Sequence, residues 1–423
     1  MLIPVLRQLT ACVFASATVH AGTPLGGFSP VKVGEGPLVC LIHPEDGIGQ
    51  SVSDGRERTE VMYLCDPGSG VKATPVWRGS VPLVVPLQRL TKNLTVVERG
   101  YECYVWDMAI GSATPLWAGG DQTSFLKAEG SKVFFLRRLL PDTSNGMKVG
   151  SGKNGKHVAE SWFRPRDKLC TLIPGEKAEA VELSVPVLEH IVETGPTGIW
   201  AVTADEPRKL CLISNDGTVT GIIPFDPHWV AGETFAVFSP ARDYLAMSVL
   251  HDEQDFDRER ELIVVDVKRK GVCHLSHNVS IGSRSYPPPI DMTWVDGTHL
   301  LFGETKSGQV LDAPAGKLAA PTGAQRQAAA PPVPPDRERK GLFDSEWGKL
   351  WFAGDKELAG SVLDETGIAV NDMEISGDGK WAAFCESGAS SVFLLDGAAR
   401  RKHLLLSGWA YNIKWLPAVE ACK

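Results

Sequence analysis

One pattern recurs along the chain and constrains its fold more than any other feature. An apolar, strand-forming run is followed by a glycine-containing turn, often after an aspartate, and then by a second short apolar run. This unit is typical of an antiparallel hairpin. Seven copies can be recognised, at residues 61–77, 101–117, 168–183, 209–225, 261–276, 341–352 and 391–406.

A second type of hairpin precedes several of these units. It joins two apolar strands through a turn rich in proline, aspartate and glycine, most clearly at residues 236–248, 291–302 and 372–384. Asp-Gly pairs supply the positive φ angles that tight hairpins need. Two successive hairpins make a four-stranded antiparallel sheet, and the shorter spacings match the roughly 40–45 residues of a propeller blade. We therefore predict an all-β chain, a seven-bladed β-propeller of four-stranded antiparallel blades.

The two ends of the chain are expected to meet in the first blade. Residues 37–42 lack a preceding inner strand, and residues 410–417 form an inner-strand pattern without outer partners. Their pairing would close the ring and protect its sheet edges. Eight blades are the alternative, with one blade in residues 308–363, although the Ala- and Pro-rich run 318–335 argues against strands there.

The C-terminal units resemble bacterial propellers of the TolB-like and WD-repeat type. The resemblance rests on residues 375–384, 392–396, 238–240 and 263–266, and it covers the last two fifths of the chain. Those families show a Ser-Pro-Asp-Gly-Lys turn, which is degraded at residues 239–243 of this sequence. The resemblance implies a propeller fold, and a fold alone does not define a function.

The N-terminus has the pattern of an export leader. Residues 1–21 combine an early arginine, a short apolar run and small residues at the expected cleavage position. A lipoprotein acylated at Cys12 is the alternative. We expect residues 22–36 to form a linker and residues 37–423 a single propeller domain, periplasmic or secreted. No later segment is long and apolar enough to span a membrane.

The net charge of the chain argues against one class of partner, and its cysteines argue against a disulfide framework. The chain has 43 Lys and Arg against 51 Asp and Glu, a net charge of −8, so it lacks the basic stripe of a nucleic-acid binder. Its cysteines are dispersed, mostly inside apolar runs, which is typical of small buried side chains. If one disulfide forms, Cys40 and Cys65 on neighbouring strands are the expected pair.

Insertions indicate where the chain binds. Residues 45–59, 140–166, 251–260 and 312–340 interrupt the sequence between the second and third strands of their blades, so they are expected on one face. Insertions on one side of a rigid scaffold build a binding surface. We predict a monomeric protein-binding or scaffolding module that binds a protein rather than catalysing a reaction. The candidate binding residues are Trp162, Arg164, Arg166 and Trp347.

A hydrolase or lactonase with a divalent cation in the central channel is the alternative function. Carboxylates and an amide on or beside the expected inner strands could converge there, and oxygen ligands of this kind suit calcium. These channel candidates are Glu193, Asp291, Asp372, Glu374 and Asn412. No other cofactor and no catalytic residue is predicted. A stoichiometric metal that copurifies with the chain would favour the enzyme.

Overall fold

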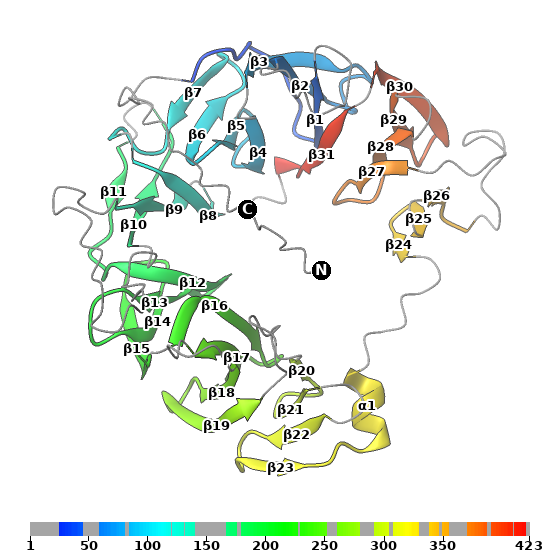
Figure 1. Ribbon diagram of the computed structural model, residues 1–423. Coiled ribbons are helices and arrows are strands. Elements are labelled where there is room, and N and C mark those ends of the chain that lie inside the picture. The colour runs from blue at the N-terminus through cyan, green and yellow to red at the C-terminus, as the bar shows by residue number, and fades with distance from the viewer. Residues whose placement is uncertain are drawn as a thin grey trace, which may run out of the picture.

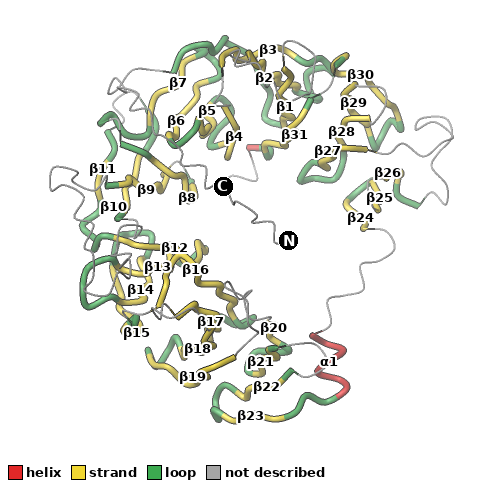
Figure 2. Tube along the Cα trace, in the orientation of Figure 1, coloured by secondary structure: helices red, strands yellow, loops and turns green. Residues whose placement is uncertain are grey.

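The computed structural model describes residues 25–44, 59–80, 84–119, 121–130, 132–139, 166–175, 179–226, 229–251, 260–279, 292–303, 308–329, 338–346, 349–354, 370–386, 391–408 and 410–419. These residues fold almost entirely into strands. The only α-helix among them is the short α1 (Gly323–Ala329), and Figure 2 shows it beside a succession of sheets.

The strands form small antiparallel sheets, which we number in chain order. The first sheet contains β31 (Tyr411–Leu416), β1 (Leu38–Pro44), β2 (Thr59–Cys65) and β3 (Thr74–Ser80). The second contains β4 (Val84–Arg89), β5 (Leu94–Arg99), β6 (Glu102–Asp107) and β7 (Ser112–Pro115). The third contains β8 (Thr123–Glu129), β9 (Lys132–Arg138), β10 (Asp167–Leu172) and β11 (Val181–Glu182). The fourth contains β12 (Leu188–Gly195), β13 (Gly198–Thr203), β14 (Lys209–Ile213) and β15 (Val219–Pro224). A single pairing of Asp167 in β10 with Leu188 in β12 joins the third and fourth into one eight-stranded sheet, and we describe its two halves separately.

The second half of the chain continues this order. The fifth sheet contains β16 (Trp229–Phe238), β17 (Tyr244–His251), β18 (Arg260–Asp266) and β19 (Gly271–Val279). The sixth contains β20 (Met292–Trp294), β21 (His299–Phe302), β22 (Gln309–Asp312) and β23 (Lys317–Ala319). The seventh has three strands, β24 (Glu338–Lys340), β25 (Phe343–Glu346) and β26 (Lys349–Phe352). The eighth contains β27 (Val370–Ile375), β28 (Trp381–Glu386), β29 (Ser391–Asp396) and β30 (Arg401–Ser407).

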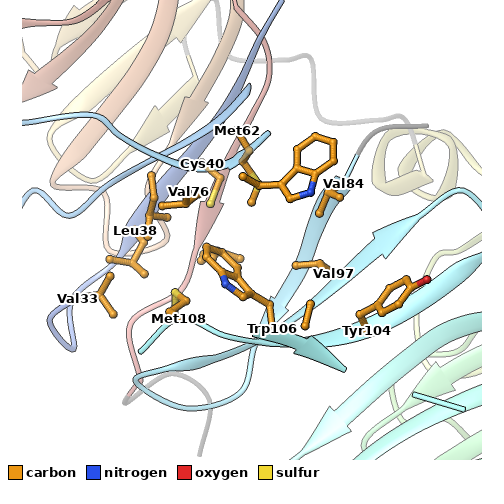
Figure 3. Packing of buried hydrophobic residues seen from close by; sticks show 14 of the residues in the cluster. Val33, Leu38, Cys40, Met62, Val76, Val84, Val97, Tyr104, Trp106 and Met108 are labelled. Atoms are coloured by element: carbon orange, nitrogen blue, oxygen red, sulfur yellow. The ribbon is translucent and has the colours of Figure 1, made fainter. Parts of the chain in front are cut away.

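The sheets stand around a common centre. Figure 1 shows one strand of each sheet nearest that centre, namely β31, β4, β8, β12, β16, β20, β24 and β27. Apolar clusters lie between neighbouring sheets and join them in the order sixth, fifth, fourth, third, second, first, eighth, seventh. Figure 3 shows the cluster between the first and second sheets, where Trp106 is fully buried. Antiparallel sheets packed face to face around a centre are the architecture of a β-propeller.

The repeat assignment is confirmed for most of the chain. Six of the expected hairpins are the third and fourth strands of their sheets, and β31 pairs with β1 as expected for the two chain ends. The assignment of residues 341–352 as the outer hairpin after the inner pair 291–302 is wrong. Strand β21 pairs instead with β22, and β22 pairs with β23, so residues 292–319 complete a sheet by themselves.

Turn chemistry explains the hairpin between β27 and β28. The Ser376 hydroxyl accepts a hydrogen bond from Trp381 N at 3.0 Å, and Asp378 accepts one from Lys380 N at 3.1 Å. Gly379 adopts a φ of 66°, the left-handed region that a side chain disfavours. The turn between β16 and β17 uses the same device, because Ser239 accepts a hydrogen bond from Tyr244 N. There Arg242, with a φ of 58°, takes the place of Gly379.

The links between strands emerge on two opposite faces, because antiparallel neighbours reverse the chain direction at every link. One face, which we call the turn face, carries the links from first to second strands and from third to fourth strands. The longest of these links are residues 66–73 and 173–180. The other face, the connection face, carries the second-to-third links and those between sheets. The long links 45–58, 139–166, 252–259, 280–291 and 320–337 all belong to it. The link 353–369 differs, because it follows the third strand of the three-stranded seventh sheet and so starts at the turn face, where Ala353 N donates to Leu342 O.

The expected insertions therefore share one face, with one correction. Residues 45–59, 140–166 and 251–260 fall between second and third strands as predicted. The position assigned to residues 312–340 is wrong, because this stretch contains β23, α1 and β24. Its long link, residues 320–337, joins the outer strand of one sheet to the inner strand of the next. A link of that type also leaves from the connection face.

Cys40 and Cys65, the pair expected if one disulfide formed, are both free thiols. Cys40 lies opposite Leu64 and Cys65 lies opposite Val39, so the two cysteines point to opposite faces of the sheet. Cys40 packs between the first and second sheets, and Cys65 packs between the first and eighth. Within the described ranges, no helix is long and apolar enough to cross a membrane.

Candidate functional site

The inner strands share a distortion that sequence patterns did not predict. In six sheets the inner strand contains one or more extra residues relative to the strand that it pairs with. In β8, for example, Phe125 and Lys127 lie opposite Phe135 and Phe134, which are consecutive in β9, so Leu126 is the extra residue. The largest such bulge lies between Val230 and Phe235 of β16. Bulges bend a strand and redirect its side chains. They therefore determine which side chains the inner wall presents.

Glu193 lies in β12 on this wall and is bound by a neighbouring sheet. Its two carboxylate oxygens accept hydrogen bonds from Arg242 at 2.9 and 3.1 Å. The Arg242 guanidinium also lies 3.9 Å from the centroid of the Phe238 ring. Both side chains are about one-third exposed. The bidentate pair fixes Glu193 as a contact between the fourth and fifth sheets.

Glu374 lies near the end of β27 and is also engaged by its neighbour. One carboxylate oxygen accepts a hydrogen bond from Trp415 N at 2.6 Å, and its carbonyl accepts one from Trp415 Nε1 at 2.8 Å. Burial raises the pKa of the Glu374 carboxyl, against the opposing effects of the Trp415 hydrogen bond and of Lys414 and Lys340. The carboxylate therefore lies between two cations on adjacent inner strands.

The remaining channel candidates do not join these two in the described structure. Asn412 lies in the bulge of β31 with a φ of 52° and is exposed. Asp291 and the side chain of Asp372 lie outside the described residues. Within the described ranges, no three His, Cys, Asp or Glu side chains are grouped to hold a metal ion. The cation site stays a prediction that depends on the two undescribed aspartates.

Side chains of several inner strands and adjoining turns clamp neighbouring sheets together. Lys127 Nζ donates to Gly195 O at 2.9 Å and to Asn215 Oδ1 at 2.6 Å, and burial lowers the pKa of this amine. Lys340 Nζ donates to Ile375 O at 2.7 Å. Trp294 Nε1 donates to Val237 O at 3.1 Å in the same way. The polar inner wall is thus largely a set of contacts between sheets.

A second group of polar side chains lies on the connection face, where residues 139–166 leave the third sheet. Leu139 N donates to Arg166 O at 2.7 Å, which closes the base of this link. Arg138 N donates to Gln122 O, and Thr123 N donates to Tyr101 O. These bonds tie the base of the link to the second sheet. We call this surface the platform and define it by Tyr101, Arg137, Arg138, Arg166, Lys168, Glu182 and Asp205.

The platform has a fixed layer. The Arg137 guanidinium lies 4.4 Å from the Trp117 ring centroid and binds Glu182 at 2.8 Å and Asp121 at 3.6 Å. Lys168 binds the same Glu182 at 3.1 Å. Stacking and two carboxylates hold a guanidinium in one orientation.

The platform also has an exposed layer. Arg166 binds Asp205 at 2.8 Å, and the two side chains are 51% and 54% exposed. Arg138 is 45% exposed and binds the buried Asp167 at 3.3 Å. Burial raises the pKa of the Asp167 carboxyl although Arg138 opposes the shift. Tyr101 is 64% exposed. Exposed ion pairs contribute little to stability, so a partner can replace one side of the Arg166–Asp205 pair at low cost.

Of the predicted binding residues, only Arg166 can be placed. Trp162, Arg164 and Trp347 lie outside the described residues. Tyr101 and Arg138 were not predicted, although the Arg137-Arg138 dipeptide directly before the insertion was a signal that could have been used. In the described part of the platform, Arg137, Arg138, Arg166 and Lys168 each form an ion pair with a carboxylate.

Comparison with known proteins gives no closer identity. The chain matches no protein-family model and no curated protein. Among solved structures it is similar to dihydro-heme d1 dehydrogenase NirN in complex with DHE, with 10% identity, a TM-score of 0.33, and coverage of 95% of this chain and 81% of that one. It is similar to Kuenenia stuttgartiensis hydrazine synthase, with 13% identity, a TM-score of 0.32, and coverage of 79% and 89%.

A third similar structure is the β-propeller domain of Myceliophteria_thermophila Cps50 (Swd1). It has 11% identity, a TM-score of 0.26, and coverage of 76% of this chain and 89% of that one. Values this low identify no relative and transfer no function. The class of the protein, a β-propeller, therefore rests on the strand topology described above.

Proposed function

We propose that this β-propeller is a protein-binding or scaffolding module that uses its connection face. The observation that carries the proposal is the asymmetry between the two faces. The links between first and second and between third and fourth strands, on the turn face, are short and are capped by side chains such as Asp378 and Asp396. One longer link, residues 353–369, follows the third strand of the seventh sheet and starts at this face. The other five long links leave from the opposite face. Variable links above a rigid scaffold are where repeat proteins bind their partners.

The platform supports this proposal with described side chains. Its fixed layer, Arg137 on Trp117, provides a surface that does not have to be ordered when a partner binds. Its exposed layer provides guanidinium groups and an aromatic ring, the side-chain types enriched among energetically important interface residues. Arg166, the candidate named from sequence, belongs to this exposed layer and pairs there with Asp205.

The proposal also includes a location for the protein and a kinship with one group of propellers. Export by the leader expected over residues 1–21 would place the partner in the periplasm or outside the cell. Kinship with TolB-like propellers would agree with that location. The alternative hydrolase gains no support from the described residues, since Glu193 is paired with Arg242 and Glu374 lies between lysines.

Charge reversal on the platform tests the proposal. Tagged full-length chain would be used to capture partners from the envelope fraction of its source, followed by mass spectrometry. We expect Arg138→Glu with Arg166→Glu to lose a partner that the wild type retains. Lys380→Glu is the matched control, because Lys380 is exposed on the turn face. If all three chains retain the same proteins, or none, the connection face is not the binding surface.

A further inference from the structure

The segment before β1, expected to be a linker, fills a groove between two sheets. Leu25 N donates to Ala113 O of β7 at 2.9 Å, and Ser29 N donates to Val76 O of β3 at 2.8 Å. Val31 N donates to Met108 O at 2.7 Å. We call residues 25–31 the strap. Its backbone binds the outer strand β3 of the first sheet and, in the second sheet, the outer strand β7 and the turn that precedes it.

The groove provides an aromatic pocket for one side chain of the strap. The Phe28 ring centroid lies 5.0 Å from that of Trp106 and 6.4 Å from that of Trp77. Both tryptophans are buried, and Leu25 and Val31 pack against the same cluster. Figure 3 shows Trp106 with Val76 and Met108 in this cluster. Tilted aromatic pairs at these distances add specificity to the burial of apolar surface.

The groove also requires glycine at one position of its occupant. Gly27 has a φ of 88°, and a Cβ there would lie 2.4 Å from Arg78 O. Arg78 N donates to Gly27 O at 3.1 Å, and Trp77 Nε1 donates to Gly26 O at 3.2 Å. The wall has a matching glycine, because a Cβ on Gly111 would lie 2.6 Å from Pro30 N. Backbone capture together with these steric limits defines a sequence-selective site for an extended segment.

We propose that this groove is a recognition site for an extended segment of the pattern Leu-Gly-Gly-Phe-x-x-Val. The strap occupies the site in cis, and the same segment of a second copy of the chain can occupy it in trans. All the contacts that define the site are made by residues 25–31, and none depends on the covalent link to β1. A tethered segment has an effective concentration in the millimolar range, so the wild-type chain keeps its own strap bound. The proposal is independent of the connection face.

The test weakens the strap in the full-length chain and offers the intact segment as a peptide. The peptide contains residues 25–33 with a fluorescent label at its C-terminus, and binding is followed by anisotropy. We expect Phe28→Ala chain to bind it at least about tenfold more tightly than the wild type, because its own strap competes less. A peptide with Gly27→Val should lose at least about tenfold in affinity to the same chain, because of the clash with Arg78 O.

Two results would overturn the proposal. One is a folded Phe28→Ala chain, shown by circular dichroism and thermal unfolding, that does not bind the peptide saturably. The other is equal binding of the wild-type and Gly27→Val peptides, which would indicate adhesion to apolar surface. If Phe28→Ala does not fold, Phe28→Leu, which keeps an apolar side chain, is measured with the same two peptides and judged by the same criteria.

Discussion

Arg242 occupies the left-handed backbone position that Gly379 occupies in the corresponding turn of the eighth sheet, with φ angles of 58° and 66°. An L-residue in this conformation costs about 1–2 kcal/mol relative to glycine. The side chain offsets the strain by binding both carboxylate oxygens of Glu193. The residue that strains the turn is thus the residue that joins the fourth and fifth sheets.

Two substitutions of Arg242 separate strain from pairing. We expect Arg242→Ala to destabilise the fold by about 1 kcal/mol, since it loses a partly exposed pair and keeps the strain. Arg242→Gly loses the same pair and relieves the strain, so it should be more stable than Arg242→Ala by about 1 kcal/mol. Urea unfolding of both variants checks this. Equal stability of the two would show that the backbone is not strained.

Glu374 should make the folded state less stable as pH rises. Burial raises the pKa of its carboxyl above the reference value of 4.5, so the folded chain binds the proton more tightly than the unfolded chain. Its contribution to stability is therefore present below pH 4.5 and is lost as pH rises through the folded pKa. Glu374→Gln removes this dependence and keeps an acceptor for Trp415 N. The measurement is the unfolding free energy of both chains from pH 4 to pH 8. After allowance for the amide substitution, the two values should be similar at low pH. At neutral pH, Glu374→Gln should be the more stable chain.

The matched control for this prediction is Glu374→Leu. It also removes the charge but leaves Trp415 N without its acceptor, which should cost about 1–3 kcal/mol. A Glu374→Gln chain whose stability falls with pH as steeply as that of the wild type would contradict the assignment of this slope to Glu374.

Arg89 is expected to stabilise the join between the chain ends. It is fully buried in the second sheet, and its guanidinium donates to the carbonyls of Gly34, Gly36, Thr91 and Lys92. Arg89→Met leaves several partly buried carbonyls without donors, so we expect a loss of about 3 kcal/mol or more. The exposed Arg269 provides the control, and Arg269→Met should change stability by less than about 0.5 kcal/mol. Similar unfolding midpoints for both variants would refute the role of Arg89.

The described cysteines should be reduced and unreactive in the folded chain. Burial raises the pKa of Cys40 and Cys103 to about 12 and of Cys65 and Cys211 to about 11. Thiolate is the reactive form, so a thiol reagent at pH 8 should label these residues only after denaturation. Peptide mapping after labelling gives the result for each residue. A Cys40–Cys65 disulfide found without reducing agent would contradict the opposite orientation of the two side chains.

The hairpins were predictable because their signals are local. An apolar run, an Asp-Gly turn and a second run lie within one short stretch, as in residues 391–406, and the structure forms them as β29 and β30. The division of residues 292–352 into two sheets was not predictable in this way. The run 318–335 reads as strand-breaking, yet its first two residues complete β23 and residues 323–329 form α1.

The side chains of the candidate site were harder to predict, since their partners are distant in sequence. Arg166 and Asp205 are 39 residues apart, and Arg137 and Glu182 are 45 apart. Strand pairing within the third sheet brings Arg137 to Glu182, and the packing of the third sheet beside the fourth brings Arg166 to Asp205. The inner-strand bulges have no sequence signal of their own, and they decide that Glu193 faces Arg242 rather than other carboxylates. The expected inner strands indicated which carboxylates lie near the wall, but the register of those strands against their neighbours determines what the carboxylates bind.

Site-specific photo-crosslinking tests the central claim most directly. Tyr101 and Ile110 belong to the same sheet, flank β6 and are 64% and 66% exposed, but Tyr101 lies on the connection face and Ile110 on the turn face. A photoreactive phenylalanine analogue would replace each residue in turn, with irradiation of cells that produce the full-length chain. We predict a discrete adduct with another protein from position 101 and none from position 110. An adduct from position 110 alone, or the same adduct from both positions, would contradict binding through the connection face.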